Sequence, residues 1–241
     1  SLSEDDACSL LELYFYNAIH SDSLNEAKYA VDRLTDTLTS DSARVAILRS
    51  IYAEQTQGTR AAADELRKCT FTTPELLKRH VAIIKSTGDK SALIDSLIEL
   101  LDTIPADPEV WSELGETYYQ LGLYQQSVYC FEEVLLSQPL AYNIYARTGE
   151  VLLSYMRSST NTKQKETLLT DAMKRFARAV ELSDDYIRGL CGLLIATKEL
   201  LLIKSTSKMV SKLHDHTKLN IERVIADSEG PDIEAAKLVL A

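Results

Sequence analysis

The densest group of potential metal ligands in this sequence is His214-Asp215-His216. Residues two apart on a helix point to different faces, so the two imidazoles are poorly placed to share one metal ion. Zinc sites on helices instead use histidines four residues apart. His20 and His80 stand alone in the sequence, and we expect them to be structural. The sequence therefore predicts no metal site.

Adjacent acids occur at Glu132-Glu133 and Asp184-Asp185. Neighbouring residues on a helix do not converge on one substrate, so neither pair resembles an acid–base dyad. Solvated helix faces explain them better, and Asp184-Asp185 also suits a helix N-terminus. No Ser-His-Asp set, Cys-His set or glycine-rich phosphate loop stands out. We therefore predict a protein that is not an enzyme and has no cofactor.

The four cysteines are too far apart to form a CxxC metal or redox pair. Each falls in a segment predicted to be helical, and we expect buried free thiols in a reducing compartment. They are Cys8, Cys69, Cys130 and Cys191.

Composition favours a folded, acidic, helical protein. The 241 residues are 45% hydrophobic and 26% charged, which is ordinary for a folded chain. With 8 Gly and 5 Pro, the sequence has few residues for the tight turns of an all-β fold. The net charge of -10 argues against binding nucleic acid, which needs a basic surface. No apolar run is long enough to span a membrane.

A repeat of 34 residues, the period of tetratricopeptide (TPR) proteins, organises the chain. This offset maps Gly88 onto Gly122, Leu97 onto Phe131 and Pro105 onto Pro139. The clearest unit runs over 108–139, where the TPR pattern W-x2-L-G-x2-Y is followed by a glycine turn, an aromatic residue and a terminating proline. These structural positions are Trp111, Leu114, Gly115, Tyr118, Gly122, Phe131 and Pro139.

The spacing of these residues predicts helix pairing. Trp111, Leu114 and Tyr118 lie on one helix face, and we expect Trp111 to be a buried anchor. Gly115 lets the two helices of the hairpin approach closely, and Gly122 supplies the turn between them.

Weaker units flank this one. Helices are expected at 4–20 and 24–38, with Ser23 a possible N-cap, and further hairpins over 44–73, 74–107 and from Tyr142 to about 186. A polar insert at 157–166 interrupts the last hairpin, either as a lengthened first helix or as a loop. We predict an all-α, right-handed TPR superhelix of about five hairpins over 1–186. Capping helices follow over 187–241, at 187–203, 205–226 and from Pro231 to Leu240.

Residues between the consensus positions on the first helix of each hairpin should face the concave surface, where TPR proteins hold partners. Tyr119 is the leading candidate because tyrosine is large and amphipathic. The predicted partner-binding residues are Lys78, Lys85, Ser112, Glu116, Tyr119, Gln120, Asn143, Ala146 and Glu150.

Lys204, Lys208 and Lys212 recur every four residues in an otherwise acidic chain. They could form a solvated helix face. They could instead contact acidic partner segments or the anionic surface of a membrane, where each cation contributes up to about 1 kcal/mol.

Beyond the repeat, residues 107–201 resemble a narrower family, subunit 2 of the endoplasmic-reticulum membrane protein complex. The distinguishing features are the Tyr129–Glu133 run, the polar insert after Tyr155, and the AxxxFxRAxEL stretch of residues 172–182 that leads into Tyr186–Gly189. Before residue 73, only the repeat pattern supports the resemblance.

The resemblance implies a non-catalytic, peripheral scaffold on the cytosolic face of the endoplasmic-reticulum membrane. Its expected partners are the cytosolic parts of the complex's membrane subunits and a soluble peripheral subunit, in an assembly that inserts transmembrane helices, including tail anchors. The alternative is a cochaperone or adaptor that binds protein tails through a basic clamp. Lys78 fits such a clamp, but Ala82 and Glu113 stand where it needs Asn.

Overall fold

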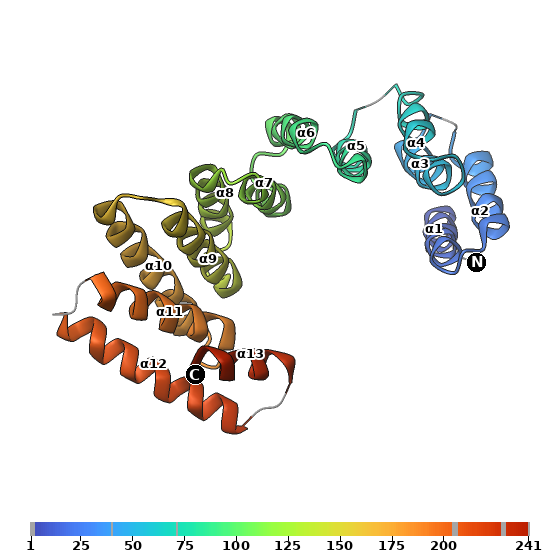
Figure 1. Cartoon of the computed structure of the whole chain (residues 1–241). Helices are drawn as coiled ribbons and strands as arrows, with labels where there is room; N and C mark the ends of the chain where they lie inside the picture. The colour runs from blue at the N-terminus through green and yellow to red at the C-terminus, as the bar shows by residue number, and fades with distance from the viewer. Residues whose placement is uncertain (1–2, 40, 71, 204–206, 228–229, 241) are drawn as a thin grey trace. The chain divides into compact units, whose positions relative to one another are not determined.

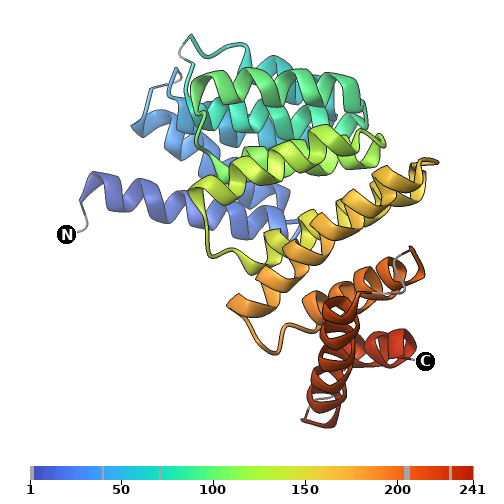
Figure 2. The same cartoon turned by 90° about the vertical axis from the view of Figure 1, so that its left-hand side faces the viewer.

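A computed structural model describes residues 3–39, 41–70, 72–203, 207–227 and 230–240. These residues form thirteen α-helices, and no strand occurs among them, which confirms the all-α prediction. The chain divides into two compact units, 1–105 and 106–241. Successive helices pair as antiparallel hairpins inside each unit (Figures 1 and 2).

The first unit contains six helices. Its main core gathers the apolar sides of the first three helices around Phe15, Leu34 and Val45, all with essentially no exposed surface. Polar residues set the helix starts: Ser3 and Asp6 form a capping box, and Asp89 caps the last helix through two backbone amides. The helices are α1 (Glu4–His20), α2 (Leu24–Thr37), α3 (Ala43–Gln57), α4 (Thr59–Leu66), α5 (Pro74–Thr87) and α6 (Lys90–Thr103).

The second unit contains seven helices, and it holds the candidate site. Two core clusters stabilise it, one centred on α9, α10 and α11 and the other joining α11 to α12 and α13. The helices are α7 (Pro108–Gln120), α8 (Tyr124–Ser137), α9 (Tyr142–Ser158), α10 (Thr162–Leu182), α11 (Ile187–Ile203), α12 (Lys208–Asp227) and α13 (Pro231–Leu240).

The α7–α8 hairpin follows from local sequence. Asp107 accepts hydrogen bonds from the backbone amides of Glu109 and Val110, and Pro108 occupies the first helical turn, so α7 starts there. Gly122 ends the helix with a φ of 74°, a conformation that glycine adopts without strain. The backbone N–H of Leu123 then donates to the Tyr118 carbonyl, 2.9 Å away.

Small residues allow α7 and α8 to approach closely. A Cβ atom at Gly115 would lie 3.2 Å from the Cys130 Cβ and from the Phe131 ring. The fully buried Ser127 hydroxyl donates to the Gly115 carbonyl at 2.8 Å, across the same contact. The backbones therefore pack closely without leaving a buried polar group unpaired.

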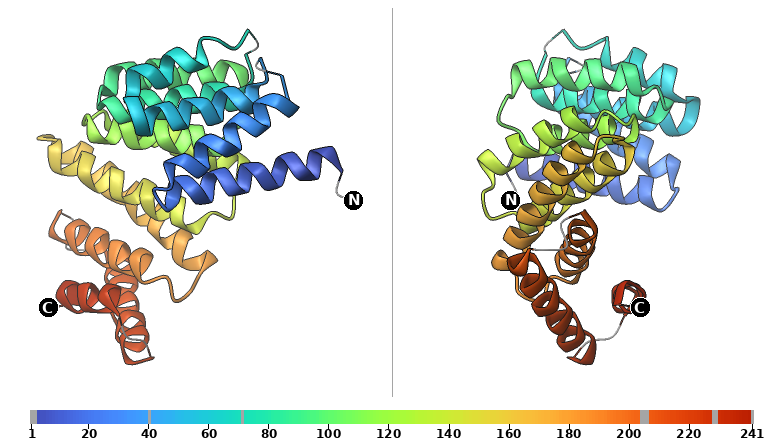
Figure 3. Two further views of the ribbon diagram at one scale, coloured as in Figure 1. Left: turned by 90° about the vertical axis from the view of Figure 1, so that its right-hand side faces the viewer. Right: turned by 60° about the vertical axis from the view of Figure 1, so that its left-hand side comes forward.

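Residues 157–166 are mostly helical. Residues 157–158 end α9 and 162–166 begin α10, so only 159–161 separate the two helices (Figure 3). Asn161 accepts hydrogen bonds from the amides of Lys163 and Gln164 and caps α10. The insert therefore lengthens both helices of the hairpin and does not form a long loop.

Some local expectations were wrong. Cys69 lies beyond the end of α4, outside a helix, where its thiol is 3.4 Å from the Asp41 carbonyl. The helix expected from 205 begins at Lys208, and residues 204–206 lie outside the described part of the chain. Ser23 precedes α2 but makes no side-chain capping bond.

Candidate functional site

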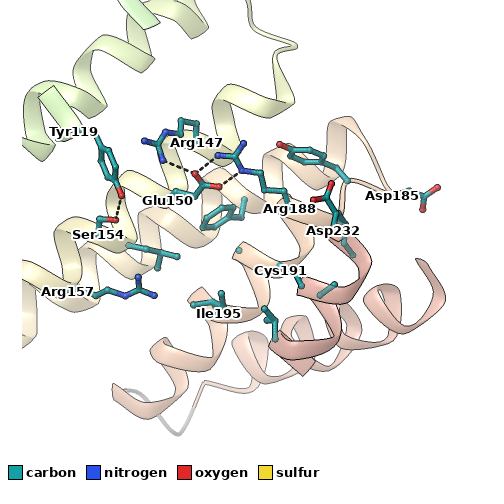
Figure 4. A pocket seen from close by; sticks show the side chains of 18 residues that line it. Tyr119, Arg147, Glu150, Ser154, Arg157, Asp185, Arg188, Cys191, Ile195 and Asp232 are labelled. Atoms are coloured by element: carbon teal, nitrogen blue, oxygen red, sulfur yellow. Dashed lines mark hydrogen bonds and ion pairs between the residues drawn. The ribbon is translucent and has the colours of Figure 1, made fainter. Parts of the chain in front are cut away.

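A cavity of about 810 Å³ opens on the second unit (Figure 4). Tyr119 of α7, several residues of α9 and one face of α11 form its sides, and α13 borders it. The cavity therefore lies on the first helices of successive hairpins, the surface on which the sequence predicts partner binding. Its lining includes Tyr119, Arg147, Glu150, Leu153, Ser154, Arg157, Asp185, Tyr186, Arg188, Cys191, Ile195, Asp232, Ala235 and Val239.

Phe176 of α10 anchors the floor of the cavity. Its side chain has no exposed surface, and two glycines lie against its ring. A Cβ atom at Gly149 of α9 would lie 2.8 Å from the ring, and one at Gly192 of α11 would lie 2.2 Å away. Real Cβ atoms do not approach so closely, so this three-helix junction requires glycine at both positions.

An ion-pair network joins α7, α9 and α11 at the edge of the cavity. Arg147 donates to both carboxylate oxygens of Glu116, at 2.6 and 2.7 Å, and to Glu150 at 3.0 Å. Arg188 donates to both carboxylate oxygens of Glu150, so the two arginines share Glu150 Oε2. Arg147 also lies 4.2 Å from the centroid of the Tyr119 ring, a cation–π geometry.

The network holds its arginines in the charged state. Burial lowers the pKa of Arg147, but the hydrogen bonds that it donates to Glu116 and Glu150 outweigh burial, and the pKa ends above its usual value. The hydrogen bonding of Arg188 to the Glu150 carboxylate likewise raises the pKa of Arg188. These charges are mutually compensated, so the network fixes the positions of three helices and presents little net charge.

Tyrosines extend this edge along α7, α8 and α9. The Tyr119 hydroxyl is 3.2 Å from the Ser154 hydroxyl, which fixes its orientation. Tyr124 packs between the rings of Tyr119 and Tyr155, with centroid distances of 5.9 and 5.8 Å. Side chains held in place in this way lose little entropy when a partner binds.

Comparison with known proteins gives the family. Residues 29–166 match the EMC2 TPR-like repeat domain, which is more than half of the chain. The chain belongs to this family. The sequence resemblance is therefore confirmed, and the match begins at residue 29, within the part before residue 73 where only the repeat pattern supported the resemblance.

Named relatives agree with the EMC2 family. The chain is 26% identical to "ER membrane protein complex subunit 2" of Saccharomyces cerevisiae, over 100% of this chain and 84% of that protein. It is also 26% identical to "TPR repeat protein oca3" of Schizosaccharomyces pombe, over 88% of this chain and 74% of that protein. Over 50% of this chain and 38% of that protein, it is 32% identical to "ER membrane protein complex subunit 2-A" of Xenopus laevis.

Solved structures support the TPR fold of this EMC2-family chain. The PilF protein of Pseudomonas aeruginosa superposes with a TM-score of 0.60 at 14% identity, over 98% of this chain and 99% of PilF. A MamA fragment from Desulfovibrio magneticus gives a TM-score of 0.54 at 15% identity, over 81% of this chain and 96% of the fragment. At these sequence identities, the structural similarity supports the fold and no particular function.

The structure brings three of the predicted partner-binding residues of the EMC2-family chain together: Glu116, Tyr119 and Glu150. Ser112 on α7 is half-buried, while Gln120 and Asn143 are exposed near the ends of α7 and α9. Lys78 and Lys85 are exposed on α5, which belongs to the first unit, whereas the cavity belongs to the second unit.

Ala146 is a correction to the predicted surface. Its side chain has no exposed area and belongs to the core cluster that includes Leu169 and Met173 of α10. α10 packs against this face of α9, so Ala146 takes part in helix packing and is not accessible to a partner.

Sequence reasoning missed several residues of the cavity edge. Arg147 and Arg188 hold the network together, Ser154 orients Tyr119, and Gly192 accommodates Phe176. A partial signal existed for Arg147, because it precedes Glu150 by three residues on one helix face. Nothing in the sequence indicated that Arg188 of α11 pairs with Glu150 of α9, which lies 38 residues earlier in the chain.

The residues of the TPR pattern occupy mixed environments. Leu114, Gly115 and Phe131 are buried, whereas Trp111 and Tyr118 are half-buried and Pro139 is exposed in the turn after α8. The Trp111 ring meets the exposed Tyr129 ring edge-on, with centroids 5.9 Å apart. Trp111 is therefore a partly exposed packing residue and not a fully buried anchor.

His214 and His216 point to different neighbours. His214 Nδ1 is 3.0 Å from the Thr197 hydroxyl of α11, and His216 Nε2 is 3.3 Å from the Asn220 amide. Within the described ranges, no three His, Cys, Asp or Glu side chains are grouped as metal ligands. In the same ranges, no helix has the length and apolar content needed to cross a bilayer.

Cysteine reactivity tests the packing of the α7–α8 hairpin. Burial, with a contribution from Glu133, raises the pKa of Cys130 to about 12, and burial also raises the pKa of Cys191. In the folded protein at neutral pH, we expect alkylation of the half-buried Cys69 first and Cys191 later. Cys8 and Cys130 should react only after unfolding. Mass spectrometry after timed alkylation measures the order, and equal rates at Cys130 and Cys69 would contradict this packing.

Proposed function

We propose that this chain is a non-catalytic scaffold subunit of the endoplasmic-reticulum membrane protein complex, peripheral to the cytosolic face of the membrane. The observation that carries the proposal is the family match over 29–166, together with relatives named as subunit 2 of that complex. In this role it holds cytosolic segments of the membrane subunits and a soluble peripheral subunit, and so supports the insertion of transmembrane helices.

The geometry of the second unit suits a scaffold. The cavity lies across three first helices, α7, α9 and α11, so a partner held there contacts several hairpins at once. Its edge is rich in tyrosine and arginine, the side chains that carry much of the energy in protein interfaces. The internal ion pairs orient this edge before a partner arrives.

The proposed contact surface consists of Glu116, Tyr119 and Glu150 with their exposed neighbours Gln120 and Asn143. The exposed part of the half-buried Ser112 side chain belongs to the same surface. Lys78 and Lys85 of the first unit are proposed to form a separate contact with a partner. On α12, the exposed Lys208 and Lys212 are proposed to contact acidic partner segments or the anionic leaflet. Lys204, expected with them, lies outside the described residues.

Affinity purification tests the proposal. The full-length protein, tagged and purified from solubilised membranes, should bring the other subunits of the complex with it. Tyr119→Ala should reduce this recovery by about fivefold or more, because an interface tyrosine can be worth more than 1 kcal/mol. Tyr129→Ala is the matched control, since Tyr129 is 55% exposed but does not line the cavity.

Melting curves of both variants check that the fold is retained. Recovery of chaperones alone, without membrane subunits, would favour the adaptor alternative. Recovery of neither class of partner would refute both functions.

A further inference from the structure

Two charges at the cavity remain unpaired although their neighbours are paired. Arg147 and Arg188 share Glu150, and Asp185 binds Arg223 of α12 at 2.9 Å. Arg157 and Asp232 also line the cavity, yet neither forms an ion pair with any residue that the structure describes. Figure 4 shows Arg157 on one side of the cavity and Asp232 on the other.

The floor between these two charges is apolar. Leu153 of α9 is buried, and Cys191 and Ile195 of α11 present half-buried side chains to the cavity. Ala235 and Val239 of α13 border the same space. An apolar floor with an unpaired charge at each side fits an amphipathic ligand better than a uniformly acidic or basic one.

The chain itself shows how the surface next to the cavity binds a helix. α13 packs on α11 by inserting Ile233 and Ala236, three residues apart, against Leu190 and Leu194. This is the helix-in-groove arrangement, in which one apolar stripe of a helix is buried. The exposed Ala235 borders the remaining space on the cavity side of α13 and, being small, leaves room for a second helix.

We propose that the cavity binds an amphipathic helical segment of a partner protein, which lies beside α13. Its apolar side chains contact Leu153, Cys191 and Ile195, a carboxylate pairs with Arg157, and a basic side chain lies toward Asp232. The inference rests on the proposed scaffold function and names the kind of segment that this part of the scaffold holds. Pairing with opposite charges on the two sides of the cavity sets the direction of the bound helix.

Site-specific photocrosslinking in the full-length protein, carried out in solubilised membranes, tests the inference. A benzoylphenylalanine in place of Ala235 should crosslink to one partner segment, which mass spectrometry identifies. The same photoreactive residue in place of Leu238 is the matched control, because Leu238 is on the same helix, 80% exposed, and does not line the cavity. The crosslink should form from position 235 and not from 238.

Charge exchange then tests the pairing. Arg157→Glu should weaken the crosslink roughly two- to tenfold, the range of a partly exposed ion pair. Lys163→Glu makes the same change of charge at an exposed site outside the cavity and should have no effect. Replacing the acid of the crosslinked segment by arginine should restore the crosslink in Arg157→Glu.

Any of these results would overturn the inference while the proposed function stands: co-purification without a crosslink at 235, equal crosslinking at 235 and 238, or failure of the charge exchange to restore binding. If complex subunits do not co-purify at all, the proposed function has failed instead. Capture of a segment that lacks an acid within a helical turn of its apolar contacts would also contradict the inference.

Discussion

Replacing Phe176 by alanine should lower the free energy of unfolding of the second unit by about 3–5 kcal/mol. The ring has no exposed surface and lies in the core cluster shared by α9, α10 and α11. Its removal leaves a cavity that the three helices cannot easily close, because glycines on α9 and α11 already hold these backbones near the ring. A loss of this size is a large part of the stability of an ordinary domain.

Chemical denaturation followed by Trp111 fluorescence measures the effect, since Trp111 is the single tryptophan and lies in the same unit. Leu136→Ala is the control, because a side chain that is 77% exposed should contribute less than about 1 kcal/mol. A loss of under 1 kcal/mol for Phe176→Ala would contradict the three-helix junction described here.

Gly192→Ala should be destabilising although alanine is the better helix former. Alanine gains about 1 kcal/mol over glycine in a helix interior. Against this, the added methyl would lie 2.2 Å from the Phe176 ring, and overpacking typically costs about 1–3 kcal/mol or more. The ring has little room to move, because the Gly149 backbone of α9 also lies against it. We therefore expect a net loss, measured in the same denaturation assay.

Two further variants make this prediction specific. Gly115→Ala should be close to neutral, since its methyl would lie 3.2 Å from its neighbours and the helix gain offsets the smaller strain. Combining Gly192→Ala with Phe176→Leu should cost less than the sum of the single changes, because the smaller side chain relieves the clash. Additive losses would show that Gly192 is needed for a reason other than the ring.

Helix boundaries could be predicted from the sequence because they are set locally. The Asp107-Pro108 start, the Gly122 turn and the helix over 187–203 all depend on residues within a few positions of the boundary. The 34-residue offset, together with the residue pattern after 107, was likewise sufficient to identify the fold and the family.

Side-chain environments were harder to predict because they depend on the neighbouring hairpin. Ala146 occupies the repeat position of Ser112, yet Ala146 is fully buried in the core shared by α9 and α10, whereas Ser112 is half-buried. Trp111 matches the consensus, but its ring is only partly covered. The pairing of Arg188 with Glu150 joins residues 38 apart, which no local pattern specifies. Repeat phase therefore predicts which helix lines the site but not which of its residues are accessible.

Acute depletion of the protein from cells, followed by sizing of the solubilised membrane subunits, tests the scaffold role most directly. A scaffold that holds several subunits at once is required for their assembly, whereas a bound adaptor is not. We expect the membrane subunits to leave the large complex when the chain is removed and to return to it when the wild-type chain is supplied again. An intact complex of otherwise unchanged composition after depletion would contradict this expectation.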